Sequence, residues 1–202
     1  MPEHKPPQQS NASDENNFVA DYFALEWPRD AEGYFHRQAA RIVAVNERQE
    51  ALLVRGHDFS DSTHWWWFTV GGGVEPGEAP HEAAVREFFE ETGHRLEAKV
   101  LTGPVLRRHA TFDFHQLTCK QDEDFFFVRI SSALQFSRAF ETEVEKQVID
   151  ELKWWDLTEL EGAIACGTVV YPLNFVPLVR GWLRGWNGET IEISEGTVLP
   201  KR

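Results

Sequence analysis

Three glutamates, Glu87, Glu90 and Glu91, stand at positions i, i+3 and i+4 of a segment with helical spacing. On a helix these spacings place the three carboxylates on one face, within reach of one another. Each pair of like charges then costs an exposed helix about 0.2–0.5 kcal/mol, and the helix dipole disfavours anions in the C-terminal half. A hard divalent cation between the carboxylates would turn this repulsion into attraction. Mg²⁺ is such an ion, and it prefers oxygen ligands. The pattern therefore indicates a metal site.

The same glutamates also fit a simpler interpretation, in which they form a solvated face supported by the pairs Glu82–Arg86 and Arg86–Glu90. The apolar side chains of this segment are expected on the opposite side, against a sheet, and two alanines beside the glutamates are expected to leave space over them. These are Val85, Phe88, Phe89 and Thr92, and Ala83 and Ala84. What surrounds the helix has to decide between the two interpretations.

The elements around this helix follow from apolar periodicity and from turn residues. Strands are expected at 39–45, 51–55, 65–70, 99–108, 112–118, 125–130 and 152–155, and helices at 80–92, 157–165 and 173–185. A polar loop is expected over 57–64, a turn at Gly71–Gly73, and Pro172 at the start of the last helix. Strands mixed with three helices predict an α/β or α+β sandwich in one domain.

Composition limits the class of protein and its partners. Residues 1–17 are rich in Pro, Gln, Asn and Ser, which predicts a disordered N-terminal tail, and the folded domain is expected over 18–202. A net charge of −13 argues against polymeric nucleic acid or an anionic membrane as partner, because both require a basic surface. Two distant cysteines and no signal-peptide pattern favour a cytoplasmic protein.

Seven residues around the glutamates have a distinctive spacing: Gly72, Glu78, Arg86, Glu87, Glu90, Glu91 and Gly93. This spacing resembles the signature of the Nudix hydrolase family, which is Gly, five residues, Glu, seven residues, then Arg-Glu-apolar-any-Glu-Glu-any-Gly-apolar. All seven fixed positions are occupied. Two positions depart from the pattern: His94 stands where an aliphatic residue is usual, and Val70 where many members have proline. The resemblance is expected to span residues 36–185.

The resemblance implies an α/β/α sandwich with a central mixed sheet and a role for each motif residue. Glu87, Glu90 and Glu91 would bind Mg²⁺ or Mn²⁺, joined by a backbone carbonyl of Gly72, and Arg86 would orient a carboxylate. Gly71, Gly73, Glu78 and Gly93 would be structural. Glu90 or Glu91 is the first choice for the general base, and Glu143 and Glu145 from a later loop are further candidates.

The implied reaction is hydrolysis of the pyrophosphate bond of a small-molecule nucleoside diphosphate linked to another moiety. Arg55, Arg107, Arg108 and His109 are candidates to receive the phosphates, and one of Trp65, Trp66 and Trp67 is expected to face outward from the core. The alternative is a nucleotide-binding module of this fold that does not cleave its ligand. An isomerase of diphosphate lipids is disfavoured by the contexts of Cys119 and Cys166. The apolar segment 173–182 is compatible with a homodimer.

Overall fold

The computed structural model describes residues 27–58, 61–114, 117–134, 136 and 149–196. Its strands are β1 Phe35–Val45, β2 Glu50–Asp58, β3 Asp61–Phe68, β4 Val70–Gly73, β5 Thr102–Phe114, β6 Leu117–Arg129, β7 Ile149–Asp156 and β8 Ile191–Gly196. Its helices are α2 Pro80–Thr92, α4 Leu157–Ala165 and α5 Phe175–Arg184, with a 3₁₀ turn at Ala98–Val100. The tail predicted over 1–17 lies outside the described residues. No helix in these segments is long and apolar enough to cross a membrane.

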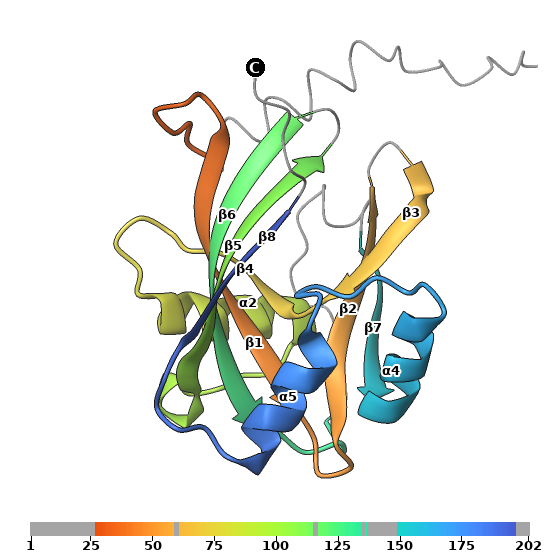
Figure 1. Ribbon diagram of the computed structural model, residues 1–202. Helices are drawn as coiled ribbons and strands as arrows, with labels where there is room; N and C mark the ends of the chain where they lie inside the picture. The colour runs from red at the N-terminus through yellow and green to blue at the C-terminus, as the bar shows by residue number, and fades with distance from the viewer. Residues whose placement is uncertain (1–26, 59–60, 115–116, 135, 137–148, 197–202) are drawn as a thin grey trace, which may run out of the picture.

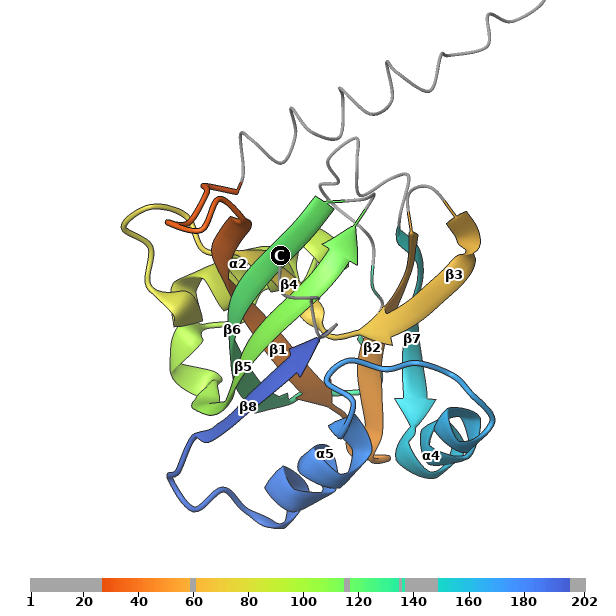
Figure 2. The same cartoon turned by 45° about the horizontal axis from the view of Figure 1, so that its top comes forward.

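The eight strands form one mixed sheet in the order β3-β2-β1-β6-β5-β8, with β4 paired to β1 and β7 paired to β2 (Figure 1). β1 runs parallel to β6, and β5 runs parallel to β8. The other pairs are antiparallel. β1 is central because it contacts β2, β4 and β6, while β8 lies at the edge beside β5 (Figure 2).

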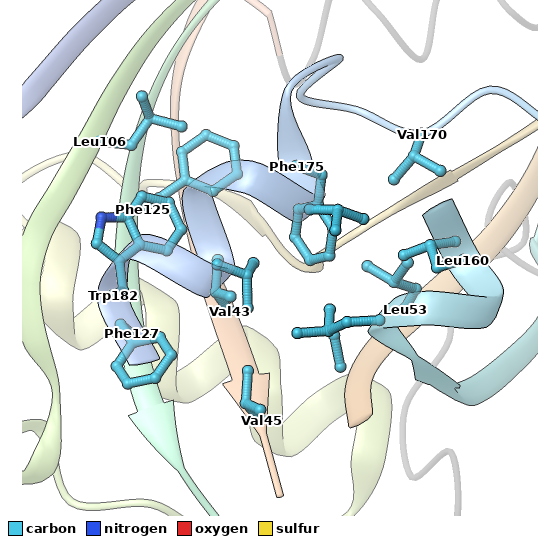
Figure 3. Close-up of a cluster of buried hydrophobic side chains, with 14 of the residues drawn as sticks. Val43, Val45, Leu53, Leu106, Phe125, Phe127, Leu160, Val170, Phe175 and Trp182 are labelled. Atoms are coloured by element: carbon cyan, nitrogen blue, oxygen red, sulfur yellow. The ribbon is translucent and has the colours of Figure 1, made fainter. Parts of the chain in front are cut away.

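Two apolar cores lie on opposite faces of the sheet, because successive side chains of each strand alternate between its faces. Ala40, Ile42 and Ala44 of β1 pack under helix α2, whereas Val43 and Val45 pack under α4 and α5 (Figure 3). Helices therefore cover both faces, and the predicted sandwich with a central mixed sheet is confirmed. The helices predicted at 80–92 and 157–165 are confirmed as well.

Several expected elements have different bounds. The expected polar loop 57–64 is largely strand, because β2 continues to Asp58 and β3 begins at Asp61, so these polar residues lie on strands next to the sheet edge. The region from 99 to 130 forms a 3₁₀ turn and two 13-residue strands instead of three short ones. Pro172 precedes the last helix, since Asn174 is the N-cap of α5. Strand β8 was not expected at all.

The three glycines predicted to form a turn belong to β4, which we call the glycine strand. Gly71, Gly72 and Gly73 pair with Arg41, Ala40 and Ala39 of β1. Gly71 has φ = +136°, and a Cβ on this residue would lie 2.2 Å from the carbonyl oxygen of Ala40. Only glycine permits both that backbone conformation and that close approach. Glycine at position 71 thus allows β4 to pair with β1 in this conformation.

We expect Gly71→Ala to lower the free energy of unfolding by at least about 2 kcal/mol, because a positive φ and an overlap with backbone both oppose the new methyl group. Gly77→Ala is the matched control: Gly77 also has a positive φ, of +85°, but a Cβ on Gly77 would meet no atom within 4 Å. The control should cost only about 1 kcal/mol. Urea denaturation measures both, and equal costs would contradict the close packing of the glycine strand.

Two imidazoles and two carboxylates form a row across β1, β6, β5 and β8. The Asp122 carboxylate faces His36 Nε2 at 2.9 Å and His109 Nδ1 at 2.6 Å. The other ring nitrogen of His109 faces Glu192 at 2.9 Å. These two carboxylates raise the pKa of His109 above its ordinary value, chiefly through the hydrogen bond to Asp122. His109 therefore stabilises the fold in its protonated form.

Because the folded-state pKa of His109 is raised, its stabilising contribution is full at low pH and is lost as the pH rises through that value. We expect His109→Gln to lower Tm more at pH 5.5 than at pH 9, measured by thermal denaturation. His81→Gln, at an exposed position of α2, is the control and should leave Tm close to that of the wild-type protein at both pH values. A His109→Gln effect that is constant with pH would refute the assigned charge row.

Candidate active site

Helix α2 is fixed by local signals at both ends and by packing along one side. Pro80 occupies the first turn, and the helix ends where Gly93 takes φ = +71° and donates its N–H to the Phe89 carbonyl. Ala83, Ala84 and Phe88 are fully buried against the sheet. The expectation that the two alanines leave space over the glutamates was wrong: their small side chains let the helix approach the sheet.

We call the three glutamates of α2 the acidic face: Glu87, Glu90 and Glu91. Arg86 forms hydrogen bonds to two of them, Glu87 and Glu90. Its Nε and Nη2 donate to the two oxygens of Glu78, each at 3.0 Å. Its Nη1 donates to Glu87 at 2.8 Å and to Glu90 at 3.2 Å. Arg86 suits this task because a planar guanidinium carries five donors in a fixed fork. One cation thus neutralises part of the repulsion among three carboxylates.

Arg86 also joins α2 to the glycine strand, because its Nη2 donates to the Gly73 carbonyl at 2.8 Å. The paired guanidinium lowers the pKa of Glu78 below its ordinary value, with the Arg86 hydrogen bond as the largest cause. The carboxylates in turn raise the pKa of Arg86, again chiefly through Glu78. Glu78 thus anchors Arg86 from the loop that precedes the helix.

Strand β4 lies beside α2 (Figure 1), and the acidic face of the helix meets the glycine strand there. Glu91 accepts a hydrogen bond from the Gly71 N–H at 3.0 Å. A Cβ on Gly72 would lie 2.5 Å from the Glu87 carboxylate, so any larger residue there would displace that group. The structure therefore brings together Gly71, Gly72 and Gly73, Glu78, Arg86 and the three glutamates.

The donor types present here fit a hard divalent cation, because three carboxylates lie beside a backbone that carries no side chains, and such cations prefer oxygen ligands. As the side chains stand, no group of three or more His, Cys, Asp or Glu in the described segments is arranged around a common ion position. Arg86 engages Glu87 and Glu90, and Gly71 engages Glu91. Cation binding would require these carboxylates to exchange such partners for the ion.

The three arginines predicted to receive phosphates do not form one cluster. Arg55, on β2, contacts Asp150 and Glu151 of β7. Arg107 and Arg108 are neighbours on β5 and so point to opposite faces of the sheet. Arg107 pairs with Asp124, and Arg108 is 8% exposed and pairs with Glu123 and Glu195. Arg108 is thus already committed to two carboxylates.

Two arginines of β1 were not among the predicted site residues, yet the structure brings both to the glycine strand. Arg37 Nη1 lies 3.3 Å from the position of a Cβ on Gly73. Arg41 Nη1 donates to the carbonyls of Thr69 and Gly71. The available signal was two arginines four residues apart, hence on one face of a strand that turns apolar after Arg41. Their partners could not be read from local sequence.

The expected outward tryptophan is confirmed, since Trp65 is 40% exposed while Trp67 is buried. The segment that contains Glu143 and Glu145 lies outside the described residues. The structure therefore places the acidic face, Arg86 and the glycine strand, but not that part of the chain.

Comparison with known proteins gives the family. The NUDIX domain model matches residues 35–170, more than half of the chain. A Bacillus subtilis (strain 168) protein named "Putative 8-oxo-dGTP diphosphatase" is 43% identical over 67 residues, covering 32% of this chain and 42% of that protein. Diphosphoinositol polyphosphate phosphohydrolase 3-beta of Bos taurus is 42% identical over 87 residues, covering 41% and 51%. The matches thus span about half or less of these relatives.

Solved structures share the fold at low identity. A MutT protein from Bacillus halodurans superposes with a TM-score of 0.52 at 15% identity, covering 79% of this chain and 90% of the other. A NUDIX hydrolase from Nitrosomonas europaea gives a TM-score of 0.50 at 23% identity, covering 74% and 90%. With the signature residues gathered on α2, just beyond its two ends and on the adjacent glycine strand, and with the family model matching 35–170, the chain belongs to the Nudix family.

Proposed function

We propose that this protein is a Mg²⁺-dependent hydrolase that cleaves the pyrophosphate bond of a nucleoside diphosphate linked to another moiety, with Mn²⁺ as an alternative ion. The observation that carries the proposal is the acidic face held against the glycine strand by Arg86. Family membership supports it, as do the names of the relatives, which are diphosphatases and phosphohydrolases.

In the proposed reaction Glu87, Glu90 and Glu91 would hold the cation, together with the carbonyl of Gly72. When bound, a divalent ion neutralises phosphate oxygens and lowers the pKa of water. Arg86 positions Glu87 and Glu90, and Glu78 positions Arg86. Because the glycines carry no side chains, a diphosphate can approach the backbone there closely.

Between the two first candidates for the general base, the geometry favours Glu90. The Glu90 side chain is 36% exposed and its contact with Arg86, at 3.2 Å, is the longest that Arg86 makes. Glu91, by contrast, is tied to the Gly71 N–H. A base must reach a water molecule and exchange protons with solvent, which suits a partly exposed carboxylate such as Glu90.

For the phosphates, Arg37 is a further candidate, because its guanidinium lies beside Gly73 of the glycine strand. Arg55 and Arg107 remain candidates for more distant parts of the substrate, whereas Arg108 would have to leave its buried carboxylates. The cytoplasmic location and the homodimer stay predictions of the sequence.

We expect Glu90→Gln to reduce kcat by about 10²- to 10⁴-fold, the range for loss of a general base. Glu82→Gln is the matched control, because Glu82 lies on the same helix but caps the backbone N–H of Ala79. It should keep near wild-type turnover. The assay is mass-spectrometric detection of products from dinucleotides, nucleotide sugars and nucleoside triphosphates, with Mg²⁺, with Mn²⁺ and after chelation by EDTA.

If the wild-type protein cleaves no member of this panel with either ion, the proposed hydrolase is wrong. Tight binding of one nucleotide without any product over hours would instead establish the alternative, a binding module of the same fold.

A further inference from the structure

A carboxylate is completely buried in the sheet behind the glycine strand. Glu123, on β6, is 1% exposed, and its two oxygens contact different arginines. Arg41 Nε lies 2.5 Å from Oε1, and Arg108 Nη1 lies 2.5 Å from Oε2. Gln121 donates a further hydrogen bond to Oε1 at 2.6 Å. Burial disfavours the charged form, but the two guanidiniums outweigh it and hold the pKa of Glu123 below its ordinary value.

The charges of this cluster are balanced. Arg108 also pairs with Glu195 of β8 at 2.8 Å, so two arginines face two carboxylates. Removing one partner of such a buried pair is strongly unfavourable because it leaves an uncompensated charge. The orientation of Arg41 is thereby fixed from the interior of the sheet, by a residue 82 positions away in sequence.

Arg41 binds Glu123 through Nε and the backbone around Gly71 through Nη1. Its Nη1 donates to the Thr69 carbonyl and to the Gly71 carbonyl, each at 3.0 Å. On the other side of Gly71, the N–H of the same residue is bound by Glu91 of the acidic face. Both peptide groups of Gly71 are therefore held by charged side chains, one anchored on Glu123 and one on α2.

Gly71 precedes Gly72, whose Cα faces the Glu87 carboxylate. A displacement of the Gly71 peptide would therefore move both the partner of Glu91 and the backbone next to Glu87. Misplacement of catalytic groups by about 1 Å can cost about 100-fold in rate.

We infer that Glu123 and Arg41 are positioning residues for the active site: the buried carboxylate orients the guanidinium, which holds the carbonyls of Thr69 and Gly71 so that the glycine strand meets the acidic face. The catalytic part of this inference rests on the proposed hydrolase. The structural part, which concerns the Gly71 peptide, does not.

The test is Arg41→Lys in the full-length protein. Lysine keeps the positive charge beside Glu123 but cannot bind one carboxylate and two carbonyls in a planar fork. We expect amide hydrogen exchange of Gly71, followed by NMR without metal, to accelerate by at least about tenfold, while exchange in β7, which pairs with β2, changes less than about twofold. We also expect kcat to fall by about 10- to 100-fold with a smaller change in KM.

The matched control is Arg129→Lys. Arg129 also donates to a backbone carbonyl, that of Leu183, but it is the last residue of β6 and does not contact the glycine strand in the described hydrogen bonds. It should leave the exchange of Gly71 and kcat unchanged. Unchanged Gly71 exchange in Arg41→Lys would overturn the inference. So would acceleration that is equal across the whole sheet, because it would show a general loss of stability without local positioning.

Should Arg41→Lys fail to fold, the double variant Arg41→Gln/Glu123→Gln removes one charge of each sign and leaves Arg108 paired with Glu195. The same local acceleration at Gly71 supports the inference, and wild-type exchange there refutes it. If the wild-type protein cleaves no substrate, the proposed function fails, whereas the exchange measurement still decides whether Arg41 and Glu123 position the glycine strand.

Discussion

The contact of Arg86 with two carboxylates of one helix face is the interaction on which the rest of the site depends. Glu87 and Glu90 would repel each other on an exposed helix, yet here they share one guanidinium. Arg86 is held in place by a two-point contact with Glu78, from outside the helix. Packing of Ala83, Ala84 and Phe88 sets α2 against the sheet, while Arg86 links the helix to Gly73 and to Glu78 and fixes the direction of two of its carboxylates.

The glycine strand is held from both faces of the sheet. From the side of α2, Arg86 binds the Gly73 carbonyl and Glu91 binds the Gly71 N–H. From the opposite side, Arg41 binds the Gly71 carbonyl. Glycine is suited to this place because its backbone is accessible from every direction, and charged side chains can use it as a set of fixed donors and acceptors. The glycine strand has no side chains of its own to pack, and its backbone is held instead by the side chains of Arg41, Arg86 and Glu91.

Local signals account for what the sequence predicted well. Pro80 and Gly93 mark the ends of α2, and the spacing of its glutamates defines one face before any fold is known. Non-local pairing accounts for what was missed. Gly71–Gly73 have no strand propensity, and they form a strand only because β1 accepts them as a partner. The partners of Arg108, Glu123 and Glu195, are 15 and 87 residues away, so its burial had no local signal. Arg41 was missed for the same reason.

Strand β8 has a consequence for how the sheet ends. It is short, and it occupies one side of β5, a strand of 13 residues. Its Glu192 contacts His109 and its Glu195 contacts Arg108, both on β5. Short, charged border strands discourage sheets from joining edge to edge, whereas a long strand with open hydrogen-bonding groups is a template for aggregation. A variant shortened before Ile191 would expose that template and would also deprive Arg108 of a counter-ion, so solubility and the interior charge balance depend on the same six residues.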